Sequence, residues 1–239
     1  MQLECYARTE TGLVRPSNQD AVGCFPELGL FAVADGMGGH DAGDVASRMA
    51  VDELRAFYER TGRADGKRLA EAVAHANQQI FDAGRVDGKV SSRPMGTTVV
   101  AVTLSKSPRR VTWAYVGDSR LYRWRKGELQ LLTADHTRFG GRFAGSEEIP
   151  LELPHTNELL AALGIEPEIA PGLGAAPWRN GDVYLLCSDG ISGLVSPAQL
   201  ITDLGQPDPL DTVGARVVEH ALEAGGSDNA SVVLVRAST

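Results

Sequence analysis

Residues 28–36 read LGLFAVADG, a short apolar run that ends abruptly at Asp35-Gly36. Such a run, stopped by Asp-Gly, predicts a buried strand that ends in a turn. Three more carboxylates stand at the ends of apolar segments, each beside Gly, Ser or Asn: Asp118, Asp189 and Asp228. An aspartate at a strand end, next to a glycine that allows close backbone approach, aims oxygen ligands at a hard cation. The pattern therefore points to a metal site built from strand ends.

A single Asp-Gly pair has a simpler explanation, because both residues are common in ordinary turns. Four such positions at the ends of buried-looking strands favour metal binding instead. Carboxylates brought together repel one another unless a cation compensates their charge. Oxygen ligands alone favour Mg²⁺, Mn²⁺ or Ca²⁺ over zinc, and the spacing does not choose among these three ions.

The rest of the chain shows strand and helix patterns in unequal blocks. We expect helices over 44–58, 67–81 and 210–222. Strands are expected over 2–8, 28–34, 97–104, 110–116, 121–125, 128–133, 182–187 and 230–236. Residues 137–180 are rich in Gly and Pro and read as loop, with one short helix near 157–163. This order lacks regular strand–helix alternation, which favours antiparallel sheets with segregated helices in one domain, 1–239.

Composition narrows the class of protein. The chain has 239 residues, a formal net charge of −8 and 43% hydrophobic residues, which is ordinary for a soluble globular protein. The acidic balance argues against a nucleic-acid partner. Three cysteines (Cys5, Cys24, Cys187) are odd in number and form no CxxC pair, so neither a disulfide framework nor a cysteine zinc site is favoured. Without a signal-peptide or membrane-spanning pattern, we expect a cytoplasmic protein with no membrane partner.

Seven short segments carry a family resemblance. They are RPSNQD (15–20), VADGMGGH (33–40), GTT (96–98), GDSR (117–120), LTADH (132–136), CSDG (187–190) and DN (228–229). The chain resembles the metal-dependent protein serine/threonine phosphatases of type 2C, the PPM family, in their short bacterial form. One DGMGG would be a weak signal, whereas seven segments in the family's order over nearly the whole chain are specific.

The resemblance implies a fold and a metal centre. The fold is α+β, a four-layer αββα sandwich of two antiparallel sheets flanked by helices, with metals in a cleft at one edge. Two Mn²⁺ or Mg²⁺ ions are expected, with a third that binds more weakly. By the family's pattern Asp35 bridges two ions and the Gly36 carbonyl ligates the first. Asp189 and Asp228 ligate the second.

Three further roles follow from the same resemblance. Asp20 acts through ordered water, Asp118 ligates the third metal together with Asp189, and Arg15 grips the substrate phosphate. A planar guanidinium suits a phosphate because it donates two parallel hydrogen bonds. Two divalent ions lower the pKa of a bridging water and give a hydroxide placed to attack phosphorus. That chemistry needs no cysteine nucleophile, so we expect Cys187 to be a core residue.

The sequence departs from the family's pattern at two positions. Met37 stands where animal members carry a histidine proposed as general acid, which leaves protonation of the leaving group to metal-bound water or another group. Gln19 stands where many members have glutamate, and a neutral residue there would weaken water-mediated metal binding slightly. Nearby His40 is given no catalytic role. Asp135 and His136 are interpreted as a buried, hydrogen-bonded structural pair.

The favoured function is hydrolysis of phosphoserine and phosphothreonine in phosphoproteins, by a monomer that opposes a bacterial serine/threonine kinase. Residues 41–47 also look like phosphatases that accompany type VI secretion kinases, and 137–180 falls where the family has its flap. A silent phosphoprotein binder would be expected to lack a metal aspartate, and all five are present. A calcium-binding structural domain would carry a D-x-D-x-D-G loop, which the sequence lacks. The family branch that acts on anti-anti-sigma factors generally lacks the arginine segment that contains Arg15.

Overall fold

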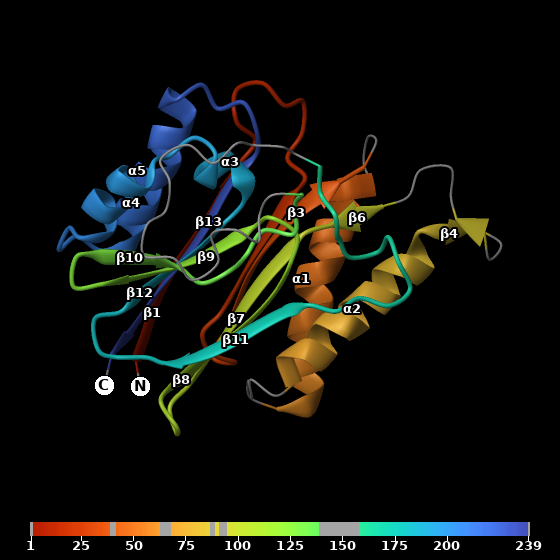
Figure 1. The fold of residues 1–239 in the computed structure, drawn as a ribbon, viewed down its shortest axis with the longest axis horizontal. Helices are drawn as coiled ribbons and strands as arrows, with labels where there is room; N and C mark the ends of the chain where they lie inside the picture. The colour runs from red at the N-terminus through yellow and green to blue at the C-terminus, as the bar shows by residue number, and fades with distance from the viewer. Residues whose placement is uncertain are drawn as a thin grey trace.

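Two antiparallel sheets stacked face to face form the centre of the computed structural model (Figure 1). The structure describes residues 2–38, 42–62, 68–86, 89–90, 95–138 and 158–238. Sheet A has the order β1-β13-β12-β9-β10, and sheet B has the order β11-β8-β7-β3-β2. The strands of sheet A are β1 (Gln2–Glu10), β9 (Arg120–Arg125), β10 (Glu128–Leu131), β12 (Val183–Cys187) and β13 (Ala230–Ser238). Those of sheet B are β2 (Asp20–Phe25), β3 (Leu30–Met37), β7 (Val99–Ser105), β8 (Arg110–Val116) and β11 (Gly172–Pro177).

Helices cover the outer face of each sheet (Figure 1). α1 (Ala42–Thr61) and α2 (Leu69–Ala83) pack on sheet B. The other three helices, α3 (Asp189–Ser192), α4 (Pro197–Leu204) and α5 (Leu210–Glu223), pack on sheet A. The short β6 (Gly96–Thr97) extends the pairing of β3, while β4 (Arg85–Val86) pairs only with β5 (Lys89–Val90).

Alternation along the strands produces three apolar layers. In β3, Leu30, Ala32 and Ala34 face the helices, while Phe31 and Val33 face the other sheet. The strands of sheet A alternate in the same way, because successive side chains on a strand point to opposite faces. One apolar layer therefore lies between the sheets and one lies under each set of helices. The expected four-layer αββα sandwich is confirmed.

The interpretation of 137–180 was partly wrong. Residues 158–163 form no helix and instead take part in isolated bridges, Thr137 with Leu159 and Thr97 with Leu163. The strand β11 was missed because its sequence, GLGAAP, lacks β-branched residues. Its glycines are needed because a Cβ at Gly172 would fall 2.2 Å from the Tyr115 ring. Residues 139–157, the centre of the expected flap, lie outside the described residues.

Two helices between β12 and α5 were also missed. α4 begins at the N-cap Ser196, whose Oγ accepts a hydrogen bond from the Gln199 N–H at 3.2 Å, with proline at the first helical position. The Ser-Pro pair was a readable start signal. α3 is a single turn of four residues, too short for any periodicity to show. No helix in the described ranges is long and apolar enough to cross a membrane.

Candidate metal centre

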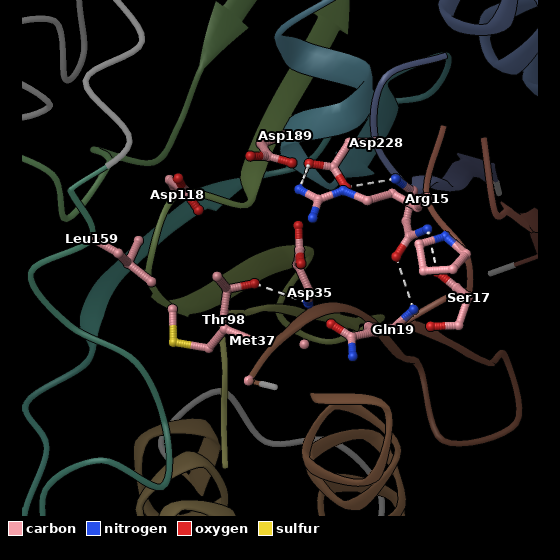
Figure 2. Close-up of a pocket in the computed structure, with 14 residues that line it drawn as sticks. Arg15, Ser17, Gln19, Asp35, Met37, Thr98, Asp118, Leu159, Asp189 and Asp228 are labelled. Carbon is pink, nitrogen blue, oxygen red and sulfur yellow. Dashed lines mark hydrogen bonds and ion pairs between the residues drawn. The ribbon is translucent and has the colours of Figure 1, made fainter. Parts of the chain in front are cut away.

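Four of the five aspartates singled out in the sequence meet at one pocket of about 770 Å³ at the ends of strands from both sheets. Figure 2 shows the carboxylates of Asp35, Asp118, Asp189 and Asp228 around this pocket, with Arg15 beside Asp228. The lining residues come from well-separated parts of the chain. They are Arg15, Pro16, Ser17, Gln19, Asp35, Gly36, Met37, Gly38, Thr98, Asp118, Leu159, Asp189, Asp228 and Asn229.

Asp35, near the end of β3, is positioned by two hydrogen bonds between its backbone and Thr98. Its N–H donates to Thr98 Oγ1 at 3.0 Å, and its carbonyl accepts from the Thr98 N–H at 2.8 Å. The next residue must be glycine, because a Cβ at Gly36 would lie 2.1 Å from the Gly43 carbonyl oxygen and 2.5 Å from that of Gln19. This close approach brings β3, the start of α1 and the Arg15-containing loop together at the pocket.

Asp118 follows β8 through a left-handed glycine. Gly117 has φ +102°, and its N–H donates to His136 Nδ1 at 3.3 Å. The hydroxyls of Ser119 and Thr98 lie 2.7 Å apart, which joins the segment after Asp118 to the residue that holds Asp35. Asp35 lies on β3 and Asp118 follows β8, and both strands pair with β7. The buried pair of hydroxyls thus links the two carboxylate-bearing segments across β7.

Asp189 and Asp228 are placed by contact between two backbones of sheet A. Asp189 is the first residue of α3, directly after β12, and Asp228 precedes β13. A Cβ at Gly190 would lie 2.0 Å from the carbonyl oxygen of Asn229. The turn after β12 therefore presses against residues 228–229, and the two carboxylates lie side by side in Figure 2.

Arg15 reaches the carboxylates from the loop between β1 and β2. Its Nη2 donates to Asp228 Oδ2 at 2.7 Å, while its side chain stays 53% exposed. The hydrogen bond and charge of Asp228, with weaker contributions from Asp189 and Asp35, raise the pKa of this guanidinium. Arg15 is therefore a fixed positive charge at the solvent side of the acidic pocket.

Asp20 lies behind the pocket and does not line it. Its Oδ2 accepts hydrogen bonds from Ser188 Oγ at 2.8 Å and Ser231 Oγ at 2.6 Å. Its Oδ1 is buried and has no hydrogen-bond partner among the described residues. Burial, only partly offset by these hydroxyls, raises the pKa of Asp20 to about 6, with added repulsion from Asp189 and Asp228.

Mutual repulsion among the carboxylates is strong. Burial, followed by the charges of Asp20, Asp189, Asp118 and Asp228, holds the pKa of Asp35 well above its usual range. Burial and the charge of Asp189 also raise the pKa of Asp118 to about 6. A cation that accepts oxygen ligands would relieve both the repulsion and the orphaned buried oxygen of Asp20.

The donor set therefore fits hard divalent cations. Four aspartates and Gly36 line the pocket. Among the described lining side chains, sulfur occurs only in Met37 and nitrogen only in Arg15, Gln19 and Asn229. Among the described residues, no three His, Cys, Asp or Glu side chains stand close enough to hold one ion as they are oriented here. One ion bound by three of these carboxylates would therefore require their side chains to rotate toward a common point.

Asn229 is the residue whose role the sequence did not reveal. Its Oδ1 accepts from the Gln19 N–H at 2.8 Å, and its Nδ2 donates to the carbonyls of Thr11 at 2.8 Å and Ser17 at 3.0 Å. One amide thus fastens both ends of the Arg15 loop to the start of β13. The Asp228-Asn229 segment was visible in the sequence, but the loop's three backbone partners were not.

Other expectations at the site had mixed outcomes. Met37 lines the pocket, and His40 lies outside the described residues. Asp135 and His136 do not form a pair with each other: Asp135 accepts from Arg120 Nη2 at 2.6 Å, and His136 accepts from Gly117. Asp135 pairs with the buried Arg120 because a guanidinium donates two charge-assisted hydrogen bonds to a carboxylate.

Cys187 was correctly interpreted as a core residue. It is fully buried among the apolar side chains between sheet A and its helices. Burial raises the pKa of its thiol to about 12, so the thiol stays protonated at neutral pH.

The sequence of this chain is similar to those of known protein phosphatases. The family model described as Protein phosphatase 2C matches residues 15–233. The serine/threonine phosphatase Stp of Listeria welshimeri is 35% identical over 239 aligned positions, which cover 95% of this chain and 93% of Stp.

Two solved structures share the whole fold. PppA, described as a key regulatory component of T6SS in Pseudomonas aeruginosa, has a TM-score of 0.84 at 31% identity, covering 100% of this chain and 99% of PppA. The catalytic domain of the serine/threonine protein phosphatase PstP, in complex with two manganese ions, has a TM-score of 0.81 at 36% identity, covering 98% and 97%. Fold, pocket and sequence agree, and the chain belongs to the protein phosphatase 2C family.

Proposed function

We propose that this chain is a metal-dependent protein serine/threonine phosphatase that hydrolyses phosphoserine and phosphothreonine. The observation that carries the proposal is the meeting of four aspartates from separate strand ends with one exposed arginine at a single pocket. The carboxylates suit divalent cations, and the arginine suits the phosphate of the substrate. We further propose that residues 1–239 act as one catalytic domain.

The residues proposed to hold the metals are those that the pocket brings together. Asp35 and the carbonyl of Gly36 are assigned to the first ion, with Asp35 shared by the second. Asp189 and Asp228 are assigned to the second ion, and the orphaned oxygen of Asp20 supports a contact through water. Bound Mn²⁺ or Mg²⁺ would supply a hydroxide at neutral pH and neutralise charge on the phosphoryl oxygens.

A third, weaker ion is assigned to Asp118. This carboxylate lies on the side of the pocket away from Arg15, and Asp189 is its strongest charged neighbour (Figure 2). Fewer protein ligands are assigned to this ion than to the other two, so we expect weaker binding there.

The chain's own groups account for phosphate binding. Arg15 is paired with Asp228 and is largely exposed, so a phosphate can approach its free N–H groups from solvent. Asn229 fixes the loop that carries Arg15, which limits the reorganisation needed on binding. Met37 lines the pocket, and no histidine occurs among the described residues of the lining. The oxygen of the leaving group therefore has no imidazole proton donor among these residues.

For partners, we propose phosphoprotein substrates and an opposing serine/threonine kinase. Likeness to PppA supports a link to type VI secretion, but PstP has the higher sequence identity to this chain, 36% against 31%. The comparisons therefore favour the general proposal over the narrower one. A monomer in the cytoplasm, without a nucleic-acid or membrane partner, remains our expectation.

The test is phosphate release from matched phosphoserine, phosphothreonine and phosphotyrosine peptides with Mn²⁺, with and without chelator. We expect turnover of the first two peptides, lost with chelator and restored by excess Mn²⁺. The competing function, a silent binder, predicts peptide binding without phosphate release. Tight binding with no turnover by folded, metal-loaded protein would contradict our proposal and support that alternative.

A further inference from the structure

Two cysteines meet between the edge strands of the two sheets. β1 is the edge of sheet A and β2 is an edge of sheet B. Cys5 pairs in register with Val235 and Cys24 with Phe31, and both partners belong to the apolar layer between the sheets. Because residues opposite each other on antiparallel strands share a face, both thiols point into that layer.

The thiols are in direct contact. Cys24 Sγ lies 2.8 Å from Cys5 Sγ and donates a hydrogen bond to it. Both side chains are half-buried at the open side of the sandwich, whereas Cys187 is fully buried on the far face of sheet A. The contact joins residues 19 positions apart, which explains why no CxxC pattern announced it.

We propose that Cys5 and Cys24 form a reversible disulfide that links sheet A to sheet B. A disulfide bond is about 2.05 Å long, so the two sulfurs need to approach by less than about 1 Å. The inference is independent of the catalytic function, since neither cysteine lines the pocket.

The oxidant is a low-molecular-weight disulfide such as oxidised glutathione. Burial raises the pKa of Cys24 to about 12 and slows that thiol, so we assign the first attack to its contact partner Cys5, which first loses its proton to solvent. Cys5 Sγ attacks one sulfur of the external disulfide and releases one thiol. Cys24 then loses its proton, attacks Cys5 Sγ and expels the second thiol. Two cysteines are oxidised, and one disulfide is reduced to two thiols.

The bond would close a chain segment that contains the Arg15 loop. Residues 5–24 run from β1 through Arg15 to β2, and Asp20 opens β2. Tying these strands together reduces the freedom of the unfolded chain, which stabilises the folded protein. We expect the melting temperature of the oxidised protein to exceed that of the reduced protein by about 5–10 °C.

The experiment treats the full chain with oxidised glutathione, then measures intact mass, free thiols in denaturant and a peptide map. The expected product loses two hydrogen atoms, keeps one free thiol and yields a peptide linking Cys5 to Cys24; dithiothreitol reverses all three changes. Cys5→Ser and Cys24→Ser should each lose this product, while the control Cys187→Ala keeps it. Three free thiols after oxidation, only glutathione adducts, or only dimers linked between chains would overturn the proposal.

Discussion

At the scale of single residues, Arg15 is the clearest functional group outside the carboxylates. It donates to Asp228, a proposed metal ligand, and its side chain is 53% exposed, so its effect on phosphate binding has to be measured at saturating Mn²⁺. A charge-assisted hydrogen bond contributes about 1.5–3 kcal/mol. Loss of that free energy is large enough to lower kcat/KM measurably without unfolding the protein.

We predict that Arg15→Ala lowers kcat/KM on a phosphothreonine peptide by about 10- to 100-fold, because the phosphate loses a charged donor. Most of the change should be in KM. Arg15→Lys should be intermediate, since an ammonium keeps the charge but not the two-pronged geometry. Wild-type KM in the alanine variant, measured at saturating Mn²⁺, would show that Arg15 does not bind phosphate.

Gly36 gives a second prediction at this scale. An added Cβ would lie 2.1 Å from the Gly43 carbonyl oxygen, so Gly36→Ala must separate β3 from α1. We expect a loss of about 2–3 kcal/mol in the free energy of unfolding and a loss of Mn²⁺-dependent turnover. The control Gly181→Ala has a positive φ but open space around its Cβ, and it should retain activity. Equal effects in both variants would contradict the close contact as the cause of the loss in Gly36→Ala.

At the scale of elements, ion pairs hold neighbouring strands in sheet A. Arg125 at the end of β9 donates through Nε and Nη2 to Asp182, both at 2.6 Å, just before β12 begins. Burial alone would raise the pKa of Asp182, but the hydrogen bonds and charge of Arg125 lower it. Asp182 is only 1% exposed, so it depends on this partner.

The pair should make stability depend on pH in acid. The folded-state pKa of Asp182 lies below its unfolded value, so the stabilisation is complete above about pH 4 and is lost as the pH falls through the folded-state pKa. Arg125→Met should cost about 2–3 kcal/mol at pH 7, less than a fully buried pair because Arg125 is 18% exposed. That difference from wild type should shrink as the solution is acidified.

Urea unfolding at pH 7 and at pH 3 measures both effects. Arg55→Met, which removes an exposed pair with Glu59 on α1, is the matched control and should change little at either pH. A cost for Arg125→Met that stays the same in acid would contradict the assigned role of Asp182.

Elements also show where the sequence was informative. The run 28–34 identified β3 because alternate residues of its part 30–34 fill two different apolar layers, so each of those five positions is hydrophobic. The strand β11 was not recognisable from its sequence. Its glycines are there because a Cβ would collide with the rings of Trp113 and Tyr115 on β8. Likewise Asp135 forms its ion pair with Arg120, not with its sequence neighbour His136. Sequence patterns predict an element when the residues that stabilise it lie within the element. They do not predict contacts with residues far away in the chain, which decide these two cases.

At the scale of the whole molecule, both sheets contribute to one pocket. Asp35 lies on β3 of sheet B, and Asp118 lies in the link from β8 of sheet B to β9 of sheet A. Asp189 and Asp228 lie beside β12 and β13 of sheet A. Stacking the sheets therefore assembles the site, and the Asn229 amide joins the Arg15 loop to it. The sequence predicted which aspartates would meet, through family resemblance and strand ends; it did not show the contacts that fix their distances.

The most direct test of the account combines Mn²⁺ titration by calorimetry with phosphothreonine-peptide turnover in wild type, Asp189→Asn and Asp211→Asn. Asp211 is an exposed aspartate at the start of α5 and serves as the matched control. We predict that Asp189→Asn stays folded, binds Mn²⁺ more weakly and loses at least about 100-fold in turnover, while Asp211→Asn behaves as wild type. Full turnover by Asp189→Asn, unaffected by chelator, would contradict a metal mechanism at this pocket.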